Sequence, residues 1–400
     1  MLPSCALVWE DPKGELKTMV QDAALHYLDN AATTIPSGKV IGAMTKSLEQ
    51  DWANPSSLYS PGAAAEKRLA QARGVVAASL GCQPGEVFFT GCGSEGNNLA
   101  ILGAVRARKG WGNRIIVSGF EHPSVAQPIA QLAREGFDVQ VVNPERDGHL
   151  DVQKMLDLVD KNTILVACMA VNNETGTIVD IQTLAAGVKE KNSRTAVHVD
   201  GVQAWMRIPL NLKNVDSCTV SAHKIHGPKG VGAVYLRQRY HILPPYLGGG
   251  QESGIRPGTE NLPGIIGMAV AAQEAKKTMT QRHARLTQLN RQLREGLAQI
   301  PGITLNSPPD GVAEVVNFSL GDIKSENMLH FLEQRKIYVS SGSACSKGAA
   351  SHTLAAMGLD EGAIDTAIRV SFCADNTPED VQALLEGLKE GKETLAKRRS

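Results

Sequence analysis

Short apolar segments rich in β-branched residues alternate with helix-like segments between about Val87 and Leu236. Seven of these segments read as buried strands: VFF, RIIVSG, VQVV, TILVACMAV, AVHVD, SCTVSA and GAVYL. The intervening segments, such as LAILGAVRARKG and IQTLAAGVKEK, carry helical patterns. This alternation predicts an α/β fold in which helices cover both faces of a mainly parallel seven-stranded sheet.

A second, smaller α+β unit is expected after this sheet. Residues Leu262 to Ile300 read as one long helix with charges on one face, and a strand–helix–strand–helix pattern then runs to about Ala396. A chain of 400 residues is long enough for two domains. We therefore expect a large domain at 25–261, and a helix at the start of 262–400 that leads into the small domain.

The first 24 residues show scattered charges and weak periodicity, so we expect 1–24 to be a poorly ordered extension, with Met19 as an alternative start. The start of the chain lacks the apolar core of a signal peptide. The longest apolar runs, such as Thr163 to Val171, are far shorter than the roughly 20 residues that a membrane span needs. These features predict a soluble, cytoplasmic protein without a membrane partner.

Charge and cysteine content narrow the possible partners. Lysine plus arginine and aspartate plus glutamate both number 41, so there is no net charge to favour nucleic acid, and we expect no direct nucleic-acid binding. The seven cysteines are an odd number without the C-x-x-C pairs of a structural zinc site. We interpret them as reduced thiols and expect no metal site.

An acid and an amine follow two neighbouring predicted strands. TAVHVDGVQ places Asp200, and SCTVSAHK places Lys224, at the carboxyl ends of strands, where ligands bind in open α/β sheets. Pyridoxal phosphate (PLP) needs such a pair, because a lysine bonds it covalently and a carboxylate keeps its pyridine nitrogen protonated. By spacing alone, Asp200 could instead cap a helix and Lys224 could lie on the surface, and Lys229 is a competing lysine.

The segment VFFTGCGSEGNNLAI runs from a strand through glycines into a helix, whose first amides could bind a phosphate. Its Gly91, Gly93 and Gly96 also form a G-x-G-x-x-G pattern, and Glu121 follows the next strand, as in a dinucleotide-binding site. The dinucleotide interpretation leaves Asp200 and Lys224 without a role, so we favour the phosphate of PLP.

Two further residues are candidates for chemistry. His122 follows the strand IIVSGFE, where it could stack on a cofactor or move protons, although an ordinary structural histidine would fit as well. Cys345 lies in SSGSACSKGAAS, whose small and polar residues predict an exposed, mobile loop with an accessible thiol. The other cysteines fit simple packing, and Cys92, inside the proposed phosphate loop, receives no chemical role.

Taken together, ten motifs resemble the NifS/IscS-type cysteine desulfurases, in the class V aminotransferase group of fold-type I PLP enzymes. In chain order they are YLDNAATT, NPSS, TGCGSEGNN, EHPSV, VNNETG, HVDGVQ, SAHK, GGGQESGIRPGTEN, SSGSAC and AIRVS. The resemblance covers about Leu25 to Leu395. It implies a fold-type I transferase with a large PLP domain and a small domain that carries a catalytic cysteine loop.

This resemblance assigns roles to individual residues. Lys224 would hold PLP, Asp200 would pair with the pyridine nitrogen and His122 would stack on the ring. Gln203 and Asn173 would bind near the ring hydroxyl. The matches to phosphate-binding positions are Gly93, Ser94, Ser221 and His223, with Thr259 reaching the phosphate of a neighbouring subunit.

The implied reaction converts L-cysteine to L-alanine. Arg369 would receive the substrate carboxylate, assisted by Asn173, because a planar guanidinium can bond both oxygens. The Lys224 amine would remove the α-proton, and the Cys345 thiolate would attack the substrate sulfur and keep it as a persulfide. A homodimer with shared sites is implied, as is a sulfur-acceptor protein in iron–sulfur cluster assembly or in transfer-RNA or cofactor thiolation.

The chain departs from the family pattern at Tyr59, at the pair Cys373 and Ala374, and in the extension before Leu25. Alternative interpretations are a selenocysteine lyase, which shares several of the motifs, and a sulfur-trafficking protein without turnover. A more distant alternative is the NAD-dependent oxidoreductase that the GCGSEG loop suggests.

Overall fold

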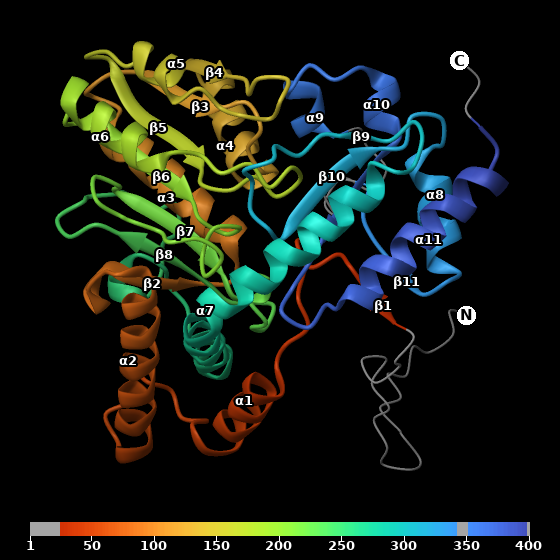
Figure 1. Ribbon diagram of the computed structural model, residues 1–400. Helices are drawn as coiled ribbons and strands as arrows, with labels where there is room; N and C mark the ends of the chain where they lie inside the picture. Colours follow the sequence, from red (N-terminus) through yellow and green to blue (C-terminus); the bar gives the residue numbers. More distant parts are fainter. Residues whose placement is uncertain (1–24, 342–350, 398–400) are drawn as a thin grey trace, which may run out of the picture.

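In the computed structural model, which describes residues 25–341 and 351–397, seven strands form one sheet in the order β2-β8-β7-β6-β5-β3-β4 (Figure 1). Their bounds are β2 Val87–Thr90, β3 Arg114–Ser118, β4 Asp138–Val142, β5 Thr163–Met169, β6 Ala196–Asp200, β7 Ser217–Ser221 and β8 Gly232–Leu236. Neighbouring strands are parallel, except that β8 runs antiparallel to both β2 and β7. The predicted mainly parallel seven-stranded α/β fold is confirmed.

Helices cover both faces of this sheet because successive strand side chains point to opposite faces. Ile115 and Val117 of β3 share a core with α3 (Gly93–Arg108) and α4 (Pro123–Arg134). Ile116, between them in the sequence, belongs to the core of the other face. That face is covered by α5 Val152–Asp157 and α6 Ile181–Lys191. All seven residues of β5 are buried, as expected for a central strand covered on both sides.

One long helix connects the sheet to the second unit. The helix predicted at 262–300 is confirmed as α7 (Leu262–Leu297). The first half of α7 packs against α1 (Gly38–Gln50) and α2 (Ser60–Leu80) in the core of the large sheet. Four leucines of its second half lie in a separate core: Leu286, Leu289, Leu293 and Leu297.

The second unit is an α+β layer around a three-stranded antiparallel sheet, ordered β12-β10-β9. Its strands are β9 Thr304–Leu305, β10 Val315–Ser319 and β12 Ala367–Ser371. Its helices are α8 Ser325–Glu333, α9 His352–Ala356, α10 Glu361–Asp365 and α11 Pro378–Thr394. Figure 1 shows α7 running from beneath the large sheet to the side of this smaller one.

The first residues that the structure describes cross over to the second unit. Strand β1 (His26–Tyr27) pairs in parallel with β11 (Ile337–Tyr338), and Leu28 is buried in the second core. Asp29 forms a bridge with Ser371 at the end of β12. The segment before α1 therefore belongs physically to both units, whereas the predicted extension 1–24 lies outside the described residues.

The carboxyl ends of the parallel strands meet at one edge of the sheet, where ligands bind in open α/β folds. Short 3-10 helices lie near this edge and at two turns: η2 Pro84–Glu86, η3 Ala222–Lys224 and η4 Gln251–Gly254. Strand β7 runs directly into η3, and β6 ends on Asp200.

Within the described ranges, the helices are all too short or too polar to cross a membrane.

Candidate active site

A cavity opens at this edge, between the carboxyl ends of the strands and the second unit. Ten residues singled out from the sequence line it: Gly93, Ser94, His122, Asn173, Asp200, Gln203, Ser221, His223, Lys224 and Arg369. Thr259 is exposed and is not among the lining residues of this cavity. Cys345 and its loop lie outside the described residues.

Lys224 is the lysine that faces the cavity. It is the last residue of η3, and its Nζ donates to the carbonyl oxygens of Ala31 at 2.6 Å and Ala32 at 2.7 Å. The competing Lys229 is exposed and lies outside the cavity lining. The amine is thus positioned by the segment that precedes α1.

Asp200 is buried at the end of β6, with both carboxylate oxygens engaged. Oδ1 accepts from the amide of Val202 at 2.9 Å, and Oδ2 accepts from Nδ2 of Asn97 at 2.8 Å. These bonds fix the carboxylate beside the cavity. A carboxylate in this position can neutralise a protonated ring nitrogen.

Asn97 connects Asp200 to two histidines and was not found by sequence reasoning. Its Nδ2 also donates to Ser124 Oγ at 2.8 Å, and its Oδ1 accepts from Nε2 of His198 at 3.1 Å. Burial lowers the pKa of His198 to about 3, so this ring is neutral and donates through Nε2. The only signal in the sequence was a polar residue on the buried face of α3.

His122 caps α4 and presents a neutral ring to the cavity. Its Nδ1 accepts from the backbone amide of Ser124 at 3.1 Å and lies 2.8 Å from the Ser124 hydroxyl. The proton of the neutral imidazole is therefore on Nε2. Burial lowers its pKa, Asp200 acts in the opposite direction, and Lys224 lowers it further.

One end of the cavity suits an anion. The N-terminus of α3 begins at Gly93, where a Cβ atom would lie 2.8 Å from Cγ2 of Val202, so only glycine fits there without movement. The first amides of a helix attract phosphate. Ser221 Oγ is buried and has no hydrogen-bond partner within the described part of the chain, and burial lowers the pKa of the neighbouring His223 to about 4.

Arg369 lies at the other end, fully buried in the centre of β12. Its guanidinium donates to Asp29 Oδ1 at 2.7 Å and to the carbonyl of Asn173 at 3.0 Å. Burial raises the pKa of Asp29, and the ion pair with Arg369 opposes this shift. Asp29, part of the YLDNAATT motif, is a second residue whose role the sequence did not indicate.

Gln203 lines the same cavity, and hydrogen bonds hold its side-chain amide in place. Its Nε2 donates to the carbonyl of Ala31 at 3.0 Å, and its Oε1 accepts from Arg207.

Together the cavity supplies anion donors at one end, a neutral imidazole and a carboxylate in the middle, an amine, and a guanidinium. The unpartnered Ser221 hydroxyl and the helix terminus fit the phosphate of PLP, and Asp200 fits its pyridine nitrogen.

The dinucleotide interpretation of the glycine motif is wrong for a structural reason. Strand β2, which leads into the motif, is at the edge of the sheet and pairs with β8 in antiparallel fashion, so the required parallel βαβ unit is absent here. Glu121, the acidic residue of that interpretation, is buried. It accepts from the amide of Met169 at 2.6 Å, and burial raises its pKa to about 8.

Comparison with known proteins agrees with this chemistry. The model of the family described as "Aminotransferase class-V" matches residues 26–384. A protein named cysteine desulfurase IscS, from Clostridium botulinum, is 37% identical over 370 residues, covering 90% of this chain and 93% of that protein. The chain belongs to the class-V aminotransferase family, whose members are PLP-dependent enzymes.

Solved structures show which kinds of family member this chain resembles. A NifS-like protein superposes with a TM-score of 0.88 at 35% identity, covering 92% of this chain and 99% of that one. The structure titled "SspA in complex with cysteine" gives a TM-score of 0.77 at 30% identity, covering 87% and 98%. Within the family, this chain is thus similar in sequence to cysteine desulfurases and in structure to NifS-like proteins.

Proposed function

We propose that this protein is a cysteine desulfurase that converts L-cysteine to L-alanine and leaves the sulfur on Cys345. The observation that carries the proposal is the convergence of Lys224, Asp200, His122 and Arg369 on one cavity. Curated relatives named cysteine desulfurase support it, as does the solved relative in complex with cysteine. The cavity would hold PLP and the amino acid side by side.

The residues divide between the cofactor and the substrate. When bound, PLP supplies an electron sink at the α-carbon of the amino acid. Asp200 would pair with the ring nitrogen, and His122 would offer an uncharged aromatic face to the ring. Phosphate would be bound by the amides at Gly93 and Ser94 together with Ser221 and His223.

Arg369 and Lys224 act on the substrate. The guanidinium of Arg369 would bind the substrate carboxylate, with Asn173 beside it, and this contact orients the amino acid. Lys224 Nζ is the group placed to take up the α-proton and return it. The carbonyls of Ala31 and Ala32 accept hydrogen bonds from this amine and would orient it for that transfer.

Sulfur transfer requires the thiolate of Cys345. The thiolate forms a bond to the substrate sulfur while the carbon–sulfur bond breaks, and the electron pair of that bond stays with the carbon, which takes up a proton. The balance is L-cysteine plus a thiol giving L-alanine plus a persulfide. A free cysteine has a pKa of about 8.5, so the site must promote loss of its proton.

The test compares the wild-type protein with Lys224→Ala and Cys345→Ser. Wild type is expected to be yellow and to release alanine and sulfide from L-cysteine in the presence of a reducing thiol. Lys224→Ala should lose the visible band of covalently bound PLP, and Cys345→Ser should keep the band and release no sulfide. A yellow protein that acts on selenocysteine and ignores cysteine would instead favour a selenocysteine lyase.

A homodimer completes the proposal. Large apolar side chains are exposed on α1 and on the loop that leads to α2: Ile41, Leu48, Trp52, Leu58 and Tyr59. Exposed apolar groups that gather on one face commonly mark an interface. Thr259 would reach the phosphate site of the second copy, and a cytoplasmic acceptor protein would receive the sulfur for iron–sulfur cluster assembly or for transfer-RNA or cofactor thiolation.

A further inference from the structure

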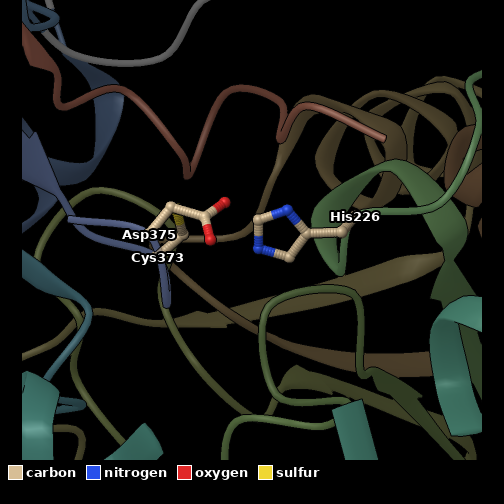
Figure 2. Close-up of side chains that lie close together, drawn as sticks. All are labelled: His226, Cys373 and Asp375. Atoms are coloured by element: carbon tan, nitrogen blue, oxygen red, sulfur yellow. The ribbon is translucent and has the colours of Figure 1, made fainter. Parts of the chain in front are cut away.

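A second group of chemically active side chains lies where the loop after Lys224 meets the loop after β12. His226, Cys373 and Asp375 each offer one potential ligand atom, and these atoms lie within 4.8 Å of one another. In Figure 2, the imidazole of His226 and the carboxylate of Asp375 point toward one another, with Cys373 beside Asp375. The three ligands come from the two different units of the fold.

The backbone and ring of His226 are fixed by the segment that precedes α1. Its backbone amide donates to Thr34 Oγ1 at 2.6 Å, and its carbonyl accepts from the amide of Ser37 at 3.1 Å. The ring donates through Nδ1 to the carbonyl of Ile35 at 2.9 Å. In the neutral ring Nε2 therefore carries the lone pair, which is the arrangement found in most metal-bound histidines.

Cys373 and Asp375 are fixed by a tight turn. The amide of Asn376 donates to the carbonyl of Cys373 at 3.2 Å, and Asn376 Oδ1 accepts from the amide of Cys373 at 2.8 Å. Asn376 Nδ2 donates in turn to the carbonyl of Tyr27 at 3.0 Å and to Asp380 at 2.9 Å. This turn places the thiol and the carboxylate on the side that faces His226.

The geometry is close to that of a metal centre. Three atoms no more than 4.8 Å apart lie at most about 2.8 Å from a common centre. Bonds from zinc to nitrogen, oxygen and sulfur are about 2.0–2.3 Å long. Side-chain movements of at most about 0.5–0.8 Å would therefore bring all three atoms to bonding distance.

Charge and access also fit a divalent cation. A thiolate and a carboxylate together balance a charge of two. The same three residues line an open cavity, which leaves a fourth coordination position to water. Other charged groups of this cavity are engaged: Glu274 with Lys39, Asp380 with His26, and Arg282 with the carbonyls of Met206 and Ala275.

We infer that His226, Cys373 and Asp375 form a zinc-type site for a divalent transition metal, which links the loop after the cofactor lysine to the second unit. Nitrogen, sulfur and oxygen ligands in this number are typical of zinc with one open position. Without a metal, burial raises the pKa of Cys373 to about 12, so the thiol is protonated and gives up its proton on binding. The sequence does not predict this site, because its ligands are distant in the chain.

The experiment measures zinc binding to the PLP-loaded protein by equilibrium dialysis and elemental analysis, without added cysteine. All proteins carry Cys345→Ser so that this thiol cannot contribute. The expected result is one zinc ion per chain, with an affinity that falls about 100-fold or more in Cys373→Ser and in Asp375→Asn, because even outer-shell changes cost about 10–100-fold. Cobalt in place of zinc should show a sulfur-to-metal charge-transfer band that Cys373→Ser abolishes.

Cys82→Ser is the matched control, since Cys82 is also a partly buried thiol whose pKa burial raises to about 12. It should bind zinc as the parent does. Less than one zinc ion per chain at saturation, or equal affinity in the parent and Cys373→Ser, would overturn the inference. Metal content is measured separately from sulfide release, so neither outcome depends on the proposed desulfurase activity.

Discussion

At the residue scale, a few buried partners that do not line the cavity hold the side chains that do. Asn97 is the clearest case, because one amide group bonds Asp200, Ser124 and His198. It therefore sets the orientation of the carboxylate and, through Ser124, of the His122 ring. We therefore expect a substitution of Asn97 to change activity by altering the cofactor site.

We expect Asn97→Ala to weaken PLP binding by about 10-fold or more, because a buried carboxylate and imidazole each lose a partner at about 1–3 kcal/mol. The measurement is the PLP dissociation constant and the pH dependence of the visible band. Asn290→Ala is the control, since Asn290 bonds the carbonyl of Ala313 far from the cavity. Equal PLP binding in wild type and Asn97→Ala would show that Asp200 is held without Asn97.

His198 makes the folded protein sensitive to acid. Its pKa is about 3 in the folded state and about 6.5 when unfolded, so the unfolded chain binds the proton more tightly. The free energy of unfolding should therefore fall as the pH drops from about 6.5 toward 3, by up to about 1.4 kcal/mol per pH unit for this residue. Above pH 6.5 this contribution is constant.

Urea unfolding at pH 7, 6 and 5 measures this slope. His198→Gln should lose less stability between pH 6 and 5 than wild type, even if it is less stable at pH 7. His149→Gln should change the slope in the opposite sense, because hydrogen bonds to Asp310 and Asp147 outweigh burial and raise the pKa of His149. An unchanged slope in His198→Gln would mean that this ring is not the acid-sensitive group.

At the element scale, short apolar runs rich in β-branched residues identified the strands of the large sheet, because the central strands are buried on both faces. The direction of β8 could not be predicted in the same way. GAVYL is as apolar as the parallel strands, and its reversal depends on the short connection after η3. The role of β1 was also hidden, since two residues, His26 and Tyr27, carry no periodicity.

The same limit applies to the site. Strand ends located Asp200 and Lys224, because a buried strand followed by a polar residue is visible in the sequence. Asn97 and Asp29 were not visible, since their partners are distant in the chain and a buried asparagine in a helix resembles an exposed one. Arg369 was identified only through the family resemblance, because it lies in the middle of an apolar strand.

Two glycines, Gly93 at the start of α3 and Gly74 in α2, lead to opposite predictions. Gly93→Ala should weaken PLP binding by about 10-fold or more, because the new Cβ atom would lie 2.8 Å from Val202 Cγ2 and shift the first turn of the helix. Gly74→Ala, in the middle of α2 with no atom within 4 Å, should stabilise the protein by about 0.5–1 kcal/mol. PLP titration and urea unfolding measure the two effects.

At the scale of the whole molecule, α7 joins two separate cores. Its buried residues up to Ala275 belong to the large sheet, and those from Leu286 onward belong to the small unit. Because the helix is continuous, unfolding of one core should also unfold the other. We therefore expect wild type to unfold in a single calorimetric transition.

Thr280→Pro tests this coupling, since Thr280 is an exposed position between the two cores. Proline in a helix interior costs about 3 kcal/mol and breaks the helix. The variant should show two transitions, whereas Thr280→Ala should keep one. Two transitions in Thr280→Ala, or one in Thr280→Pro, would contradict the role of α7 as the connection.

The segment before α1 has a consequence for how the chain is made. Leu28 is buried in the second core, Asp29 binds Arg369, and Ala31 and Ala32 bind Lys224. Arg369 follows Asp29 by 340 residues, so the ribosome adds it much later, while domains generally fold as units during synthesis. The cavity therefore cannot close before β12 has been synthesised, so a nascent chain or a chain truncated before β12 has no complete place for the cofactor.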